Sequence, residues 1–156
     1  MGGKVSDSQR IKEWLGQEGS VLIIGPKEPV DYQDGSSQLL DLLQQLVPNV
    51  KAQVYSLASV VKYASDKYTF YEKVKFLPVS EFLVESTQRK GYDGKAVLFL
   101  SFYRNQLQRL VNNCKNYGGK VTAVSLDRDP IEGADLCLAD RHLSHEEWLK
   151  ALQGLA

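Results

Sequence analysis

Short apolar runs alternate along this chain with segments whose apolar residues recur at helical spacing. Ser20–Gly25 (SVLIIG) and Lys95–Ser101 (KAVLFLS) are short and continuously apolar, which indicates strands buried on both faces. Further apolar runs lie near residues 53, 75, 122 and 137. Alternating strands and helices predict an α/β fold, with helices on both faces of a mostly parallel sheet of five or six strands.

The predicted helices are marked by apolar spacing and by residues that begin or end helices. A first helix is expected over Ser8–Glu18, after a Ser6-x-x-Gln9 capping pattern, with residues 1–7 flexible before it. The last helix has the most complete start: Ser144-x-x-Glu147 is a capping box, and Leu143 and Trp148 occupy the positions of a hydrophobic staple. Other helices are predicted over residues 39–47, 57–64, 80–90 and 107–117.

Length and charge limit the classes of protein to which the chain can belong. Its 156 residues suit one domain, and 19 Lys and Arg balance 19 Asp and Glu, so no overall field favours nucleic acid or an anionic membrane. The longest apolar runs are far shorter than the roughly 20 residues of a membrane span. With a polar start that lacks a secretory signal, the chain is expected to be cytoplasmic. Two cysteines without Cys-x-x-Cys spacing indicate buried thiols.

Function is expected at the carboxyl ends of the strands, where parallel α/β sheets bind ligands. A glycine at such an end lets a ligand approach the backbone closely, and the free N–H groups of a following helix favour an anion. A phosphate, as in FAD or another nucleotide, or a carboxylate would suit this position. The predicted binding residues are Gly25, Lys27, Ser101, Arg104, Asn105 and Arg128.

A competing interpretation treats these cations as surface charges. Gly-x-Gly-x-x-Gly is absent, and Pro26 has no N–H to offer a phosphate. Charged loop residues commonly face solvent or pair with acidic neighbours. If a nucleotide does bind, Arg104 can donate two hydrogen bonds to its phosphate, so Arg104→Ala is expected to weaken binding about ten- to a hundredfold.

Other catalytic chemistry finds little support in the sequence. His142 and His145 lie near Asp140 and Glu146, but His145 occupies the first position of the capped helix, so both histidines are read as exposed residues and no metal site is predicted. Ser101 has neither a histidine close by in the sequence nor a Gly-x-Ser-x-Gly turn around it. No catalytic residue is therefore predicted.

The second half of the chain resembles a known family. The similar segments are YDGKAVLFLSFY from Tyr92, KNY from Lys115, VSLDR ending at Arg128, Ala134-Asp135 and LSHEEWL from Leu143. Over about two-fifths of the chain, they are similar to the ε subunit of the archaeal-type acetyl-CoA decarbonylase/synthase (CO dehydrogenase) complex. VLIIGP (21–26) looks like the family's opening strand and turn.

This resemblance implies a three-layer, Rossmann-like domain of the NAD/FAD-binding type found as the central domain of thiamine-diphosphate enzymes. It also implies a non-catalytic partner of the larger, nickel–iron–sulfur CO dehydrogenase subunit in the one-carbon metabolism of an anaerobe. Within the family, the small subunit is assigned either to stabilising the complex or to helping electrons pass to a flavin. Self-association stays open.

Sugar-isomerase domains are a second, weaker resemblance. Gly25, Ser101 and Ala134-Asp135 fit their outline of strand ends. Their Ser-x-Ser-Gly-x-Thr phosphate loop corresponds here to Ser101-Phe-Tyr-Arg-Asn105, in which bulky residues replace the small ones that admit a phosphate. This alternative implies a phosphosugar-binding domain, either an isomerase or a regulatory module.

Overall fold

The fold is built on one six-stranded sheet in which every strand pair is parallel. The computed structural model describes residues 2–25, 42–56, 74–76, 96–117 and 122–155. The strands are β1 (Val21–Ile24), β2 (Gln53–Ser56), β3 (Val74–Phe76), β4 (Ala96–Leu100), β5 (Thr122–Ser125) and β6 (Leu136–Cys137). The prediction of an α/β fold with a parallel sheet is confirmed.

The strand order is β3-β2-β1-β4-β5-β6, which is the Rossmann order. The chain builds outward from β1 to β3, then returns to the other side of β1 and builds outward again. β1 and β4 therefore lie side by side, with Ile24 opposite Leu100 in the register. Ligands of such folds bind outside the strand ends at this reversal of direction, so Gly25 and Ser101 border the expected site.

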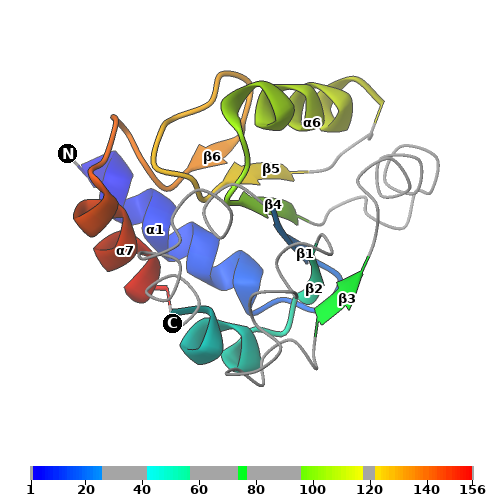
Figure 1. Cartoon of the computed structure of the whole chain (residues 1–156), viewed down its shortest axis with the longest axis vertical. Helices are drawn as coiled ribbons and strands as arrows, with labels where there is room; N and C mark the ends of the chain where they lie inside the picture. Colours follow the sequence, from blue (N-terminus) through cyan, green and yellow to red (C-terminus); the bar gives the residue numbers. More distant parts are fainter. Residues whose placement is uncertain (1, 26–41, 57–73, 77–95, 118–121, 156) are drawn as a thin grey trace.

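Helices cover both faces of the sheet, as Figure 1 shows. Alternate strand residues pack into two separate apolar clusters: Leu22 and Leu98 belong to one, and Ile23 and Phe99 to the other. The first cluster is covered by α1 (Gly2–Leu15), the helical residues 42–46 and α7 (His145–Gln153), and the second by α6 (Arg104–Tyr117). This is the three-layer arrangement expected for continuously apolar strands.

The first helix begins earlier than the sequence pattern predicts. α1 starts at Gly2 and not at Ser8, so Ser6 lies inside the helix and the predicted cap at Ser6 is wrong. No proline occurs between residues 2 and 15, so every residue of this stretch has the backbone N–H that a continuous helix needs. The predicted helices at 57–64 and 80–90, and the start of the one at 39–47, lie outside the described residues.

The later helical segments end close to their predicted ends, but α6 begins at Arg104, before the predicted start at residue 107. The helical residues 42–46 lead into a 3₁₀ turn, η1 (Val47–Asn49), which contains Pro48. α6 ends at Tyr117, directly before the two glycines expected to stop it. In α6 the apolar stripe packs inward, with Leu107, Leu110, Val111 and Cys114 all buried.

Trp148 is the largest side chain in the core. It is fully buried in the cluster beneath α1 and α7, together with its staple partner Leu143. Its indole Nε1–H donates to the carbonyl oxygen of Leu126 at 2.8 Å, just beyond the end of β5. The one polar atom of this ring is thereby satisfied inside the core, and α7 is tied to the sheet.

The start of α7 confirms the predicted capping box. The Ser144 Oγ accepts from the Glu147 N–H at 3.1 Å, and Glu147 Oε1 accepts from the Ser144 N–H at 3.1 Å. The other carboxylate oxygen, Oε2, accepts from the Arg141 guanidinium at 2.7 Å. The bond from Arg141, followed by that from the Ser144 N–H, lowers the pKa of Glu147 to about 2.

This lowered pKa predicts a contribution of Glu147 to acid stability. An unfolded glutamate titrates near pH 4.3, so the stabilisation is fully present above that pH and is lost as the pH falls toward about 2, where the folded pKa lies. We expect the unfolding free energy, measured by urea denaturation between about pH 5 and 2, to fall less steeply in Glu147→Gln than in the wild type. Glu146→Gln, which leaves the capping box intact, is the control and should retain the stabilisation that comes from Glu147. Equal slopes in Glu147→Gln and the wild type would contradict the prediction.

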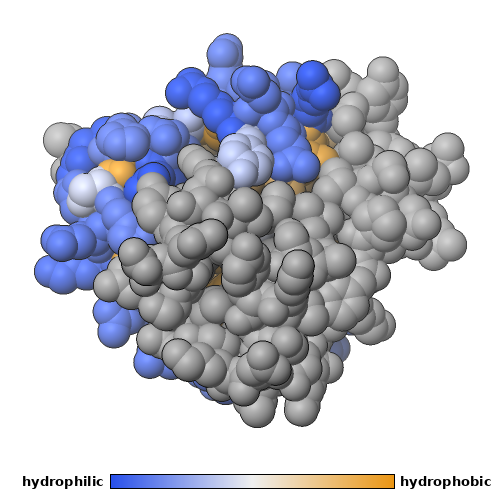
Figure 2. All heavy atoms as spheres, viewed as in Figure 1, coloured by the Kyte–Doolittle hydropathy of each residue, from blue (hydrophilic) through white to orange (hydrophobic). Residues whose placement is uncertain are grey.

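The described surface is mainly hydrophilic on the face shown in Figure 2, with small apolar areas between polar side chains. Among the described residues, Tyr103 is the large hydrophobic residue that is exposed to solvent, with a relative accessible surface of 42%. None of the described helices is long and apolar enough to cross a membrane. Cys114 is buried as predicted, whereas Cys137 is half-buried, because the short edge strand β6 is covered less completely than the central strands.

Candidate functional site

The turn after β1 is closed by the segment that follows β4. The Gly25 N–H donates to the Leu100 carbonyl oxygen at 2.7 Å, which continues the pairing of the two strands by one residue. A Cβ atom added to Gly25 would lie 2.5 Å from the Ser101 carbonyl oxygen and 2.8 Å from Cγ and Cδ1 of Phe102. Glycine is needed here for a close approach, but the group that approaches is the protein's own chain.

The carboxylate of Asp127 binds the main chain at the end of β4. Its Oδ1 accepts from the Ser101 N–H at 2.5 Å, and its Oδ2 accepts from the Phe102 N–H at 3.2 Å. Ser101 is fully buried and has a φ of +69°, in the left-handed region that is uncommon for residues other than glycine. Consecutive main-chain N–H groups that converge in this way form a concave anion-binding arrangement. The anion seated in it is a side chain of the same protein.

Asp127 lines a small pocket together with two of the predicted cations. Arg104, the first residue of α6, and Arg128 both line a small pocket of about 20 Å³ at the ends of β4 and β5. A cavity of this size holds about one water molecule. The pocket is lined by Phe102, Arg104, Leu107, Asp127, Arg128, Asp129 and Ile131, so two carboxylates accompany the two guanidinium groups.

The histidines lie next to this pocket. His142 Nδ1 is 2.6 Å from Asp129 Oδ1, and the His142 side chain is 70% exposed. His145 is half-buried, contrary to the expectation of an exposed helix-start residue, because it lies at the side of the Trp148 ring with 6.0 Å between ring centroids. Burial, followed by the nearby charge of Arg128, lowers the pKa of His145. Among the described residues, no group of three or more His, Cys, Asp or Glu side chains is placed to hold a metal ion.

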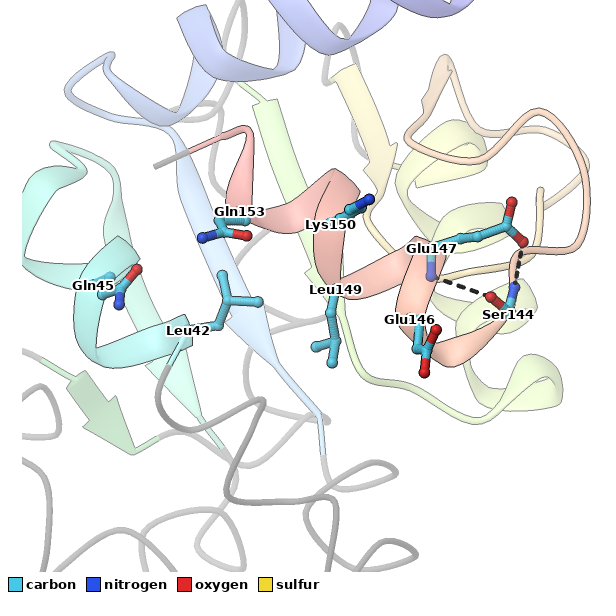
Figure 3. A pocket seen from close by; sticks show the side chains of 8 residues that line it. All are labelled: Leu42, Gln45, Ser144, Glu146, Glu147, Leu149, Lys150 and Gln153. Carbon is cyan, nitrogen blue, oxygen red and sulfur yellow. Dashed lines mark hydrogen bonds between the residues drawn. The ribbon is translucent and has the colours of Figure 1, made fainter.

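A larger hollow of about 550 Å³ lies between the helical residues 42–46 and α7. Figure 3 shows Leu42 and Gln45 on one side and residues at the start and along the length of α7 on the other. Its lining residues are Leu42, Gln45, Ser144, Glu146, Glu147, Leu149, Lys150 and Gln153. None of the predicted binding residues that the structure describes lines this hollow.

The structure brings together most of the predicted site residues that it describes. Gly25 and Ser101 are neighbours across β1 and β4, and Arg104 and Arg128 share the small pocket. Asn105 is exposed near the start of α6, and Lys27 lies outside the described residues. Whether these residues bind a ligand stays a prediction.

Sequence reasoning missed two residues that shape this region, Asp127 and Phe102. The position of Asp127 two residues beyond β5 was a usable signal, because carboxyl ends of adjacent parallel strands meet at one edge of the sheet. A carboxylate there is able to reach the main chain at the end of β4. For Phe102, no local pattern indicates that its ring packs against Gly25.

No known protein family matches the chain, and no curated protein aligns with it as a significant relative.

Proposed function

We propose that this protein is a cytoplasmic, non-catalytic accessory subunit that binds and stabilises the larger catalytic subunit of a CO dehydrogenase/acetyl-CoA synthase-type complex. The partner's identity rests on the resemblance of residues 92–155 to the ε subunit of such complexes. The Rossmann-like strand order agrees with the fold that this resemblance implies.

The non-catalytic part of the proposal rests on one observation: side chains of the protein itself occupy the space at the ends of β1 and β4. In nucleotide-binding proteins of this architecture, a ligand occupies the crevice outside these strand ends. Here the Phe102 ring lies against Gly25, and the Asp127 carboxylate takes the N–H groups of Ser101 and Phe102. Because these two N–H groups already have an acceptor, they are not available to a phosphate. This supports a protein that uses its fold to bind a partner and not a nucleotide.

A flavin-linked role in electron transfer is the finer part of the proposal. It requires FAD to bind to the complex, with Arg104 and Arg128, which line the small pocket beside Asp127, as the cations for its phosphates. Because two aspartates share their pocket, we expect the isolated protein to bind an anionic nucleotide weakly or not at all. A flavin site would then be completed by the catalytic partner.

Reconstitution with the proposed partner tests the main statement. The purified protein is mixed with the nickel–iron–sulfur CO dehydrogenase subunit of the same organism and analysed by size-exclusion chromatography. We expect the two to co-elute and the catalytic subunit to unfold at a higher temperature in the complex, because a partner that binds only the folded state stabilises it. Separate elution at micromolar concentrations, with no thermal shift, would refute the proposal.

Calorimetric titrations with ADP, FAD and a sugar phosphate complete the test on the same protein. We expect no saturable heat from the isolated wild-type chain. Saturable nucleotide binding that Arg104→Ala weakens about ten- to a hundredfold would instead assign the strand ends to a nucleotide. Sugar-phosphate binding with isomerase turnover would favour the alternative of a sugar-isomerase domain.

A further inference from the structure

We propose that the end of β4 is an oxyanion-binding site whose resident ligand is the Asp127 carboxylate, and that this carboxylate keeps free phosphate out. This inference does not depend on the identity of any protein partner. In this inference, Asp127 determines which anions can bind at the end of β4.

The geometry around the carboxylate is that of a bound anion. Two consecutive N–H groups, of Ser101 and Phe102, each donate to a different oxygen, at 2.5 and 3.2 Å. Hydrogen bonds to a charged acceptor are stronger than neutral ones. The Ser125 Oγ accepts from the Asp127 N–H at 3.4 Å, which helps to hold the main chain of Asp127 in place.

The surroundings add positive charge to these donors. Arg104 and Arg128 line the same pocket as Asp127. α6 has 14 residues and begins at Arg104, so the partial positive charge of its first turn lies at the same end of the sheet. The second acidic group of the pocket, Asp129, is held by His142 at 2.6 Å. Once the carboxylate of Asp127 is removed, cations and N–H donors dominate the site.

The described residues leave little space beside Asp127 for a second anion. The pocket beside Asp127 has about 20 Å³, close to the space of one water molecule. A phosphate would also meet the negative charge of Asp127 directly. Shortening the side chain removes both obstacles at once, and since Asp127 is only half-buried, the space that results is near solvent.

The test is rescue of Asp127→Ala by inorganic phosphate. This variant leaves two N–H donors without their acceptor, so its melting temperature should be lower than that of the wild type. At about ten times its dissociation constant, phosphate should raise the melting temperature of Asp127→Ala by about 3–6 °C, relative to chloride at the same ionic strength. The rise should saturate with phosphate concentration.

Two further proteins serve as matched controls. The wild type keeps both carboxylate oxygens on the two N–H groups, and Asp127→Asn keeps a side chain of the same length that still fills the site, so neither should show a saturable rise. Adding Arg104→Ala to Asp127→Ala should weaken phosphate binding about tenfold or more, because a charge-assisted contact is lost. An equal response of all variants, or a folded Asp127→Ala that does not respond, would overturn the proposal.

If Asp127→Ala does not fold in chloride, folding that depends on phosphate supports the same conclusion. Asp127→Ser, whose hydroxyl replaces one acceptor, is then measured in the same way. A folded Asp127→Ser without a phosphate response would count against the site.

Discussion

Replacing Trp148 with alanine should destabilise the protein by about 3–5 kcal/mol, the cost typical of removing a large aromatic side chain from a core. Trp148 is 0% exposed and is the largest fully buried side chain. Its removal leaves a cavity beneath α7 and takes the Nε1–H donor away from the Leu126 carbonyl oxygen. Both effects lower the free energy of unfolding, since that carbonyl becomes a buried acceptor without this donor.

Urea denaturation of the wild type, Trp148→Ala and Trp148→Phe separates the two contributions. Trp148→Phe retains much of the ring volume and loses the indole N–H, so it should cost less than Trp148→Ala, about 1–3 kcal/mol. A loss below about 1 kcal/mol in Trp148→Ala would show that α7 contributes little to the stability of the sheet.

Gly25→Ala should also destabilise strongly, by about 2–3 kcal/mol or more. The added Cβ would lie 2.5 Å from the Ser101 carbonyl oxygen and 2.8 Å from two Phe102 ring atoms. The first neighbour is main chain and the second is a buried ring, so neither moves aside easily. Relief of the clash requires that the ends of β1 and β4 separate, although they share the hydrogen bond from Gly25 to Leu100.

Gly16→Ala is the matched control for this substitution. A Cβ on Gly16 would make ordinary contacts at 3.6 and 3.7 Å with the carbonyl oxygens of Glu13 and Lys12. Alanine there also reduces the freedom of the unfolded chain, so this variant should be neutral or more stable by up to about 1 kcal/mol. The melting temperatures of Gly25→Ala and Gly16→Ala, measured by thermal unfolding, test this difference. Equal stabilities of the two variants would disprove the close packing at Gly25.

The strand-end packing has a consequence for how this fold is used. Gly25, Phe102 and Asp127 together occupy the place where a Rossmann-like sheet offers its binding crevice. A Gly25→Ala variant that opens the strand ends should also disturb the contact between Asp127 and the main chain of Phe102. The stability of the strand ends and the proposed exclusion of phosphate by Asp127 thus depend on the same few residues.

The sequence by itself determined the kinds of the described elements and their order along the chain. Continuous apolar runs such as 21–24 and 96–100 identify strands buried on both faces, because helices cover both sides of a parallel sheet. The start of α7 was equally readable, since the capping box uses hydrogen bonds between Ser144 and Glu147, only three residues apart. Signals of this kind act within one or two turns of chain, so one sequence suffices to detect them.

Only the tertiary structure decided which strands are neighbours and what fills their ends. Sequence reasoning placed Gly25, Ser101 and Arg104 at strand ends and left open whether the cations there bind a ligand or are surface charges, but it did not find a carboxylate of the same chain at this position. The acceptor is Asp127, which lies 26 residues beyond Ser101 and reaches it because β5 pairs with β4. Contacts between residues so far apart in the sequence depend on the order and register of the strands. Strand order and register follow from the packing of the whole sheet, so no local sequence pattern reveals them.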